Sequence, residues 1–350
     1  MNSVNGSTRP TAGGVTHVGR WICLVLLASM PSACSPRAAA STTRGARVVA
    51  TDLNSDQETV AVIHSDIAGA AEMRFGNTRG ELSHAAWEPY TNDRLWYLPG
   101  YNYRTQQIVY AEYRGSSLPS TGLALPVYAA APGTPDGGTF PPIAVPDRRA
   151  SSDIIDHRFD TWSERWASYQ DAYGHGNVFY PLTHQRTGGA DGGGFAWTDD
   201  SRWLVDAPET PDSILFALNY WRWLFPAEWR AKTGAGDVVN LEGATLEVAL
   251  RGRGLDLGTA HVTFWLLCGG ARWHLSQPLT AGVEQWATNR VALPDGAAAW
   301  QRSWSRGGEA VPFCLDKVES YGFAFRGFQL DHLPRGVIDI DDFRLTRDRS

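Results

Sequence analysis

The sequence predicts an all-β protein made of a small sandwich domain followed by a larger one. The 36 glycines and 20 prolines divide the chain into short pieces. The 15 tryptophans, against only 3 methionines, supply many large flat side chains. Short apolar runs with alternating character recur between clusters of Gly, Asn and Asp. A chain of 350 residues is longer than one compact core usually holds, so we expect two domains.

The charge of the chain argues against a nucleic-acid partner. The formal net charge is −6, and the Lys and Arg residues are scattered without a basic run. A chain with this charge distribution predicts no basic patch that could bind a phosphate backbone.

Residues 1–34 predict an export segment. An apolar run at 21–30 follows a polar stretch and is too short to span a bilayer. Ser32-Ala33-Cys34 resembles a bacterial lipobox, which implies lipidation of Cys34; a plain secretory signal and an uncut hydrophobic start are the alternatives. Residues 35–47 are polar and small, which predicts a tether. We therefore expect a protein of the bacterial cell envelope that is periplasmic, anchored to the outer membrane or secreted.

Only two cysteines lie outside the export segment, Cys268 and Cys314. Both have strand-like surroundings, and two leftover thiols in an oxidising compartment tend to pair. The sequence leaves open a disulfide and a pair of buried free cysteines.

Residues 48–115 predict the small sandwich, with Trp87, Trp96 and Tyr110 as core aromatics. The motifs MRFGN at 73–77, WEPY at 87–90, LWYL at 95–98 and QIVYAEYR at 107–114 resemble the Ig-like repeats of bacterial surface proteins. The resemblance implies an Ig-like sandwich that acts as a spacer.

Residues 116–150 predict a Pro/Gly-rich linker, because this density of Pro opposes both helices and inner strands. Proline stiffens a linker, so we expect the two domains to be held apart.

Residues 151–347 predict the larger sandwich. Apolar alternation indicates successive strands, at 243–250, 261–267, 272–275, 286–293, 320–325 and 336–345. The segment 214–224 is either a short helix or another strand.

The closing strand resembles the last strand of galactose-binding-like jelly rolls, the fold of many carbohydrate-binding modules. The resemblance lies in IDIDDFRL at 338–345 and in an expected early strand that opens with Phe159-Asp160, before Trp162 and Trp166. It implies a jelly roll over 151–347 and a structural calcium ion that ties the first strand to the last. The carboxylates that match are Asp160 and Asp341, with Asp342 as a spare, and solvated turn acids are the alternative.

A glycine-rich stretch at 188–194 carries the candidate ligand site. It is followed by aromatic and charged residues, which are Trp197, Asp199, Arg202, Trp203 and Asp206. Aromatic faces stack on sugar rings while charged and amide groups hydrogen-bond the hydroxyls. Trp273 and His274, and the cluster Trp221-Arg222-Trp223, are candidates to extend the same surface. The alternative makes the tryptophans core residues and the aspartates turn formers.

No metalloprotease, hydrolase-elbow or phosphate-loop motif is present in the sequence. We therefore expect a glycan-binding protein whose jelly roll carries out no chemistry. A polysaccharide hydrolase or lyase with a carboxylate pair in the same groove is one alternative. A structural or adhesion protein of the envelope is the other.

Overall fold

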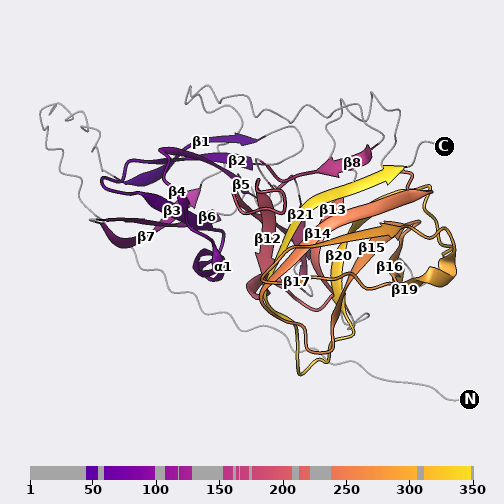
Figure 1. Cartoon of the computed structure of the whole chain (residues 1–350). Helices are drawn as coiled ribbons and strands as arrows, with labels where there is room; N and C mark the ends of the chain where they lie inside the picture. Colours follow the sequence, from indigo (N-terminus) through magenta and orange to yellow (C-terminus); the bar gives the residue numbers. More distant parts are fainter. Residues whose placement is uncertain are drawn as a thin grey trace, which may run out of the picture. The chain divides into compact units, whose positions relative to one another are not determined.

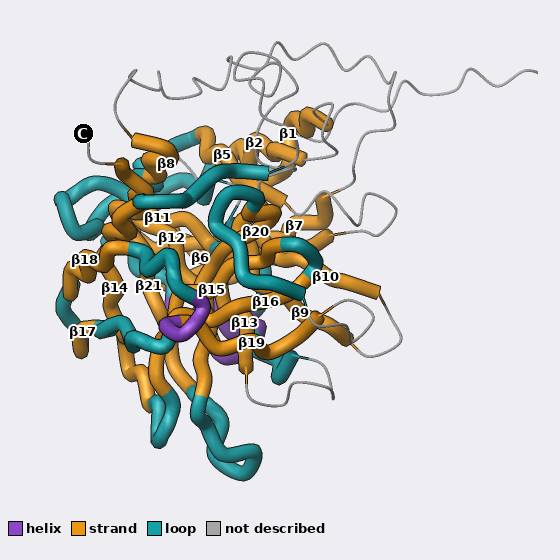
Figure 2. The backbone as a smooth tube through the Cα atoms, turned by 90° about the vertical axis from the view of Figure 1, so that its right-hand side faces the viewer, coloured by secondary structure: helices purple, strands orange, loops and turns teal. Residues whose placement is uncertain are grey.

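The computed structural model describes residues 45–53, 59–98, 107–116, 118–127, 153–160, 163–164, 166–172, 176–206, 213–220, 238–305 and 311–347 (Figure 1). The predicted export segment with Cys34, most of the tether, and the cluster at 221–223 lie outside the described residues. Strands make up most of the described chain (Figure 2). This confirms the all-β prediction. No helix in the described ranges is long and apolar enough to cross a membrane.

The small sandwich has a three-stranded sheet of order β1-β2-β5 and a four-stranded sheet of order β4-β3-β6-β7. The strands are β1 (Ala46–Leu53), β2 (Thr59–Ser65), β3 (Glu72–Gly76), β4 (Glu88–Pro89), β5 (Asp93–Leu98), β6 (Gln107–Gly115) and β7 (Leu118–Val127). Helix α1 (Arg79–His84) begins after Thr78, whose hydroxyl accepts a hydrogen bond from the backbone N–H of Glu81.

The core of the small sandwich lies between these sheets. Trp96 and Phe75 come from opposite sheets, and their ring centroids are 5.5 Å apart. Trp87 is half-buried instead, with the guanidinium groups of Arg74 and Arg114 at 4.6 and 4.1 Å from its ring. Trp96 is therefore a core residue as expected, whereas Trp87 is held by cation–π contacts at the rim.

Strand β7 corrects the predicted start of the linker. It pairs with β6 along its length, within the range that the proline content assigned to the linker. The strand includes Pro119 and Pro126, and it lies at the edge of its sheet. An edge strand tolerates proline because it leaves one row of N–H groups unpaired. The remainder of the predicted linker, 128–150, lies outside the described residues.

The large sandwich has two seven-stranded sheets. The first has the order β10-β9-β13-β20-β15-β16-β19. Its strands are β9 (Ala167–Ala172), β10 (Gly176–Pro181), β13 (Ser213–Tyr220), β15 (His261–Cys268), β16 (Ala271–Leu275), β19 (Trp300–Ser305) and β20 (Val318–Arg326). The described part of the segment 214–224, which the sequence left open between helix and strand, therefore lies in the strand β13, and residues 221–224 lie outside the described residues.

The second sheet has the order β11-β12-β21-β14-β17, with β18 also paired to β14 and β8 to β21. Its strands are β8 (Asp153–His157), β11 (Thr183–Gln185), β12 (Phe195–Asp199), β14 (Ala244–Asp256), β17 (Gly282–Val283), β18 (Ala287–Ala292) and β21 (Arg335–Arg347). The 3₁₀ turns η2 (Asp200–Arg202) and η3 (Ala297–Ala299) connect strands.

The main core lies between these two sheets. Because side chains alternate between the two faces of a strand, every second residue of these strands points into the core. Leu246, Val248 and Leu250 of β14 point into it. On β21 a bulge at Asp342, with φ 47°, shifts the alternation by one residue. Asp341 and Asp342 therefore stay out of the hydrophobic cluster while Phe343 enters it.

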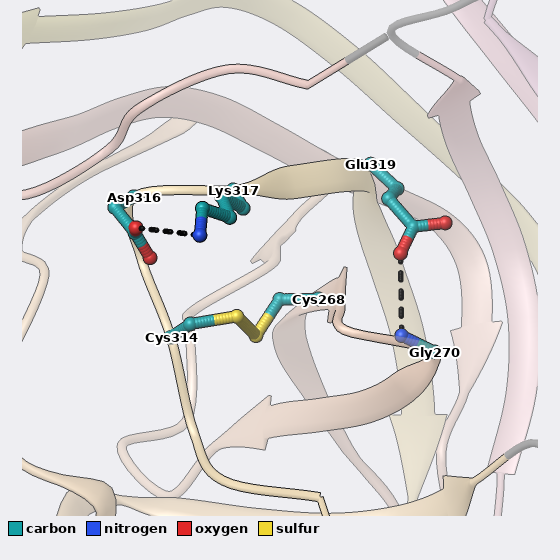
Figure 3. The surroundings of a disulfide bond; sticks show 6 residues. All are labelled: Cys268, Gly270, Cys314, Asp316, Lys317 and Glu319. Carbon is teal, nitrogen blue, oxygen red and sulfur yellow. Dashed lines mark hydrogen bonds and ion pairs between the residues drawn. A yellow bond between two sulfur atoms is a disulfide. The ribbon is translucent and has the colours of Figure 1, made fainter.

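Cys268 and Cys314 form a disulfide (Figure 3). Cys268 ends β15 and is fully buried, and Cys314 lies in the segment before β20. Beside it, the backbone N–H of Gly270 donates a hydrogen bond to Glu319. The bond joins the chain across a separation of 46 residues.

Candidate functional site

The residues that sequence grouped into one ligand site occupy three different places. Trp197 lies on β12 and is fully buried, in a cluster with Phe195 and with Ala85 of the small sandwich. The guanidinium of Arg253 is 5.3 Å from the Trp197 ring and donates to the carbonyl of His84 at the end of α1. The small sandwich therefore contacts this face of the large one, which corrects the expectation that the two are held apart.

Buried ion pairs join the two sandwiches beside Trp197. Arg202 Nε lies 2.9 Å from Glu81 Oε1, and both side chains are almost fully buried. Burial raises the pKa of Glu81, which the charge of Arg202 opposes. Asp199 caps η2 and also contacts His84, with 3.0 Å between Oδ2 and Nδ1. Asp199 is therefore the turn former of the alternative interpretation.

A second polar contact lies further along the same interface. Glu88 of the small sandwich binds Arg94 at 2.9 Å and Arg186 of the large one at 3.0 Å. Arg94 also donates to the ring Nδ1 of His184, whose Nε2 lies 2.7 Å from the carbonyl oxygen of Phe159. Since arginine only donates and a carbonyl only accepts, His184 carries its proton on Nε2. Burial, with the nearby arginine charge, lowers the pKa of His184 to about 3.

Trp203 and Trp273 belong to the core of the large sandwich. Trp203 is buried at 4.7 Å from the Phe325 ring, and Trp273 packs at 5.4 Å from Phe313. Neither Trp197 nor Trp203 offers a ring face to a sugar in this structure. The expectation of an exposed platform made of these two residues is thus corrected, because Trp203 directly follows the turn η2 and packs into the main core, while the small sandwich covers Trp197.

Asp206 and His274 lie on a different surface, the outer face of the first sheet. Trp265 alternates along β15 with Phe264 and Leu266, which enter the main core, so Trp265 points outward. We name its surroundings the arginine–tryptophan face. Its residues are Asp206, Trp265, Arg272, His274, Gln301, Ser303, Trp304 and Arg326.

Arg272 is the centre of this face. Its guanidinium carbon lies 5.3 Å from the ring of Trp265 and 5.8 Å from that of Trp304. It also forms an ion pair with the buried carboxylate of Asp206. Trp265 is buried, whereas Trp304, on the edge strand β19, is half-buried. The face therefore combines partly accessible aromatic surface with fixed charges.

The imidazole of His274 is fully buried beside these groups. Its Nε2 lies 2.9 Å from the hydroxyl oxygen of Ser303. Burial, and then the charges of Arg326 and Arg272, lower the pKa of His274 well below its usual value. His274 is therefore neutral, and the charged groups of the face are its two arginines and Asp206.

A smaller aromatic cluster lies on the outer face of the second sheet. The guanidinium of Arg251 is 4.3 Å from the ring of Trp286 and 4.9 Å from that of Phe195. Its Nε lies 2.7 Å from the buried Asp339 carboxylate. Trp286 donates to the carbonyl of Gly188, so this cluster anchors the glycine-rich loop.

The glycine-rich loop approaches the two predicted calcium ligands. A Cβ on Gly189 would lie 2.5 Å from Asp341 Oδ2, and one on Gly193 would lie 2.6 Å from Asp160 Oδ1. The N–H of Ala190 donates to Asp341 at 2.6 Å. Burial, and also repulsion from Asp191, raises the pKa values of Asp160 and of Asp341, the latter to about 7. The described residues contain no group of three His, Cys, Asp or Glu side chains arranged to hold a metal ion.

Sequence reasoning did not place Trp265 and Trp304 on the outer face of the first sheet. The signal for Trp265 was present, because it alternates with the core residues Phe264 and Leu266 in β15. No comparable signal marks Trp304, because a bulge between Arg272 and Trp273 interrupts the pairing of β16 with β19.

No family model matches the chain, and no curated protein matches it either. Its structure is similar to that of the family 11 carbohydrate-binding module of the cellulosomal cellulase Lic26A-Cel5E of Clostridium thermocellum, with 9% identity and a TM-score of 0.32. The similarity covers 55% of this chain and 95% of that one. The Clostridium thermocellum family 11 module in complex with a beta-1,3-1,4-mixed-linked tetrasaccharide gives 12% identity and a TM-score of 0.29, over 52% and 96% of the chains.

A surface glycan-binding protein, PbSGBP-B from Prevotella bryantii, is also similar, with 10% identity and a TM-score of 0.27 over 83% of this chain and 73% of that one. The structural neighbours are thus β-sandwich carbohydrate-binding modules and a surface glycan-binding protein. Superpositions as loose as these do not assign a ligand to the present chain.

Proposed function

We propose that the protein binds a glycan at the arginine–tryptophan face and does no chemistry there. The observation that carries the proposal is the position of Arg272 between the rings of Trp265 and Trp304, with Asp206 as its ion-pair partner. Stacking on a half-buried tryptophan and charge-assisted hydrogen bonds to hydroxyl groups are the two interactions that a sugar ring needs.

The cellular location of the protein and the role of the small sandwich are part of the same proposal. We propose an exported envelope protein, with Cys34 as the site of a lipid anchor and the Ig-like sandwich as its membrane-proximal part. The buried pair Glu81–Arg202 and the partly buried pair Glu88–Arg186 support a small sandwich that holds the large one in a fixed orientation.

We further propose that a calcium ion binds beside the glycine-rich loop. Asp160 and Asp341 would hold it together with backbone carbonyls of that loop, and such an all-oxygen donor set suits this hard cation. Calcium accepts carbonyl and water ligands, so a third acidic side chain is not required. The bound ion would neutralise carboxylates whose charged form is disfavoured by burial and by the charge of Asp191.

The test is affinity electrophoresis of the exported part of the chain through gels that contain a panel of soluble polysaccharides, with released sugar measured in the same mixtures. We expect retardation without release. Trp304→Ala should abolish the retardation, whereas the matched control Trp286→Ala should retain it, since Trp286 is also half-buried against an arginine but directly precedes β18 of the second sheet.

Equal losses in the two variants, or none in either, would contradict the assignment of the site to the arginine–tryptophan face. Release of reducing ends or unsaturated sugar would show an enzyme.

A structural role in the envelope is the second candidate function. The burial of Trp197 and Arg202 against the small sandwich favours it, because those residues then serve the interface between domains. Lack of retardation by every polysaccharide of the panel would select this candidate.

A further inference from the structure

Among the described residues, the members of the arginine–tryptophan face carry more positive than negative charge. Arg272 and Arg326 bring two guanidinium groups, and Asp206 is the single carboxylate among its members. The other polar members are neutral, namely Gln301, Ser303 and His274. The lowered pKa values of His274 and of His261, to which burial and then the charge of Arg326 contribute in both cases, are consistent with a positive field at this face.

The same face has buried donors that lack acceptors. Trp265 Nε1 and Arg272 Nε are both buried and have no hydrogen-bond partner. Neither group can accept a hydrogen bond. Leaving a buried donor unsatisfied is costly, so two such groups side by side indicate a missing acceptor.

A neutral sugar hydroxyl both donates and accepts, whereas a carboxylate or a sulfate ester only accepts and binds arginine with charge-assisted bonds. We propose that the arginine–tryptophan face selects acidic glycans, in which a sugar carboxylate pairs with its guanidinium groups and the sugar ring stacks on Trp304. This inference rests on the proposed glycan-binding function and adds the chemical class of the ligand.

The test compares polymers that differ only in charge. Equilibrium dissociation constants are measured for polygalacturonate and for its fully methyl-esterified form, in 150 mM salt with EDTA. A sulfate-only polymer, dextran sulfate, and a neutral mixed-linkage β-glucan complete the panel. We expect polygalacturonate to bind at least about tenfold more tightly than its ester, which is the factor that one retained charge-assisted hydrogen bond supplies.

Three variants locate the preference. Arg326→Gln should reduce the preference for the acid over the ester, and so should Asp206→Asn/Arg272→Gln, which removes both charges of the buried pair. Arg290→Gln is the control, because Arg290 is exposed and lies on β18 of the second sheet. It should leave the preference unchanged.

The outcomes distinguish a failure of the acidic-glycan inference from a failure of the proposed glycan-binding function. Equal binding of acid and ester, or equal losses in Arg326→Gln and Arg290→Gln, overturns the acidic-glycan inference. If the neutral glucan alone is bound and Trp304→Ala abolishes that binding, the glycan-binding function holds and the inference fails. Binding of dextran sulfate but not of polygalacturonate overturns the proposal that a sugar carboxylate is the recognised group. A sulfate ester would then be that group. Absence of binding to all four polymers overturns both proposals.

Discussion

Glu81 of α1 and Arg202 of η2 form an ion pair that is almost completely buried between the two sandwiches, with 2.9 Å from Oε1 to Nε. Glu81 also accepts a hydrogen bond from the backbone N–H of Asn77, so one carboxylate both stabilises the start of α1 and joins the domains. Removal of the Arg202 charge leaves the buried Glu81 carboxylate without the positive charge beside it.

Arg202→Met should therefore lower the free energy of unfolding by about 3–5 kcal/mol, the range for breaking a buried pair from one side. The double variant Glu81→Gln/Arg202→Met should lose less than Arg202→Met alone, since the glutamine keeps a hydrogen-bonding group at the helix start without a charge. Urea unfolding measures both. An unfolding free energy equal to that of the parent in Arg202→Met contradicts a buried pair.

His184 should make the stability depend on pH. The unfolded state binds a proton to this imidazole below about pH 6.5, whereas the native pKa is about 3, so the unfolded state binds more protons between these values. Stability is thus lost as the pH falls, by about 2 kcal/mol from pH 7 to pH 5, at 1.36 kcal/mol for each unit below 6.5.

His184→Gln should flatten this part of the pH profile, because an amide can donate to the Phe159 carbonyl and accept from Arg94 without titrating. Chemical unfolding at pH 5 and pH 7 checks the prediction. His332→Gln, at an exposed position, is the control and should keep the parent's slope. A slope in His184→Gln as steep as the parent's would assign the pH dependence to another group.

Trp203→Ala should destabilise the protein rather than remove a ligand contact. The indole is buried against Phe325 and Phe216, with ring centroids at 4.7 and 6.4 Å, so its loss should cost about 3–5 kcal/mol. Leu204→Ala, at the exposed neighbouring residue, should cost less than about 0.5 kcal/mol. The urea concentrations at the unfolding midpoints of the two variants are compared, and equal m-values allow their difference to be read as a difference in stability. If Trp203→Ala kept its stability and lost glycan binding, the core assignment would be wrong.

Loss of the disulfide should lower stability by about 4 kcal/mol, from the loop-closure entropy of a 46-residue separation. Cys268→Ala/Cys314→Ala is the variant to measure, with and without dithiothreitol. The parent should shift to the stability of the variant when reduced, while the variant itself should not respond to the reductant. A parent that is indifferent to reductant would show that the two thiols do not pair in solution.

Calcium should raise the melting temperature of the EDTA-treated protein, because an ion that binds only the native state stabilises it by mass action. Asp341→Asn should remove the response, whereas Asp331→Asn, at an exposed position, should retain it. A melting temperature that calcium leaves unchanged in the parent would identify Asp160 and Asp341 as turn acids without a metal.

The sequence predicted most of the large sandwich at the level of strands. Alternation is a local property, so β14, β15 and β21 could be recognised from their own residues. The doubled aspartate at 341–342 marked the last strand, although the bulge that places Asp342 at φ 47° could not be foreseen.

The candidate site was far less predictable, because it depends on contacts between distant residues. Trp197 and Trp203 are six positions apart, yet η2 turns the chain between them, and they end in different hydrophobic clusters. The covering of Trp197 by Ala85 depends on the small sandwich, about which the residues near Trp197 carry no information. Trp265 could have been assigned to the outer face only once its neighbours were known to face the main core.

The disulfide has a consequence for proteolysis. The bond between Cys268 and Cys314 closes a covalent loop that contains Arg272, His274, Gln301 and Trp304. A protease that cuts one peptide bond inside this loop leaves both pieces joined through sulfur. In denaturing gel electrophoresis a nicked molecule should therefore migrate as one chain without reductant and as two chains with it. The residues of the arginine–tryptophan face that lie in this loop stay attached to the rest of the large sandwich.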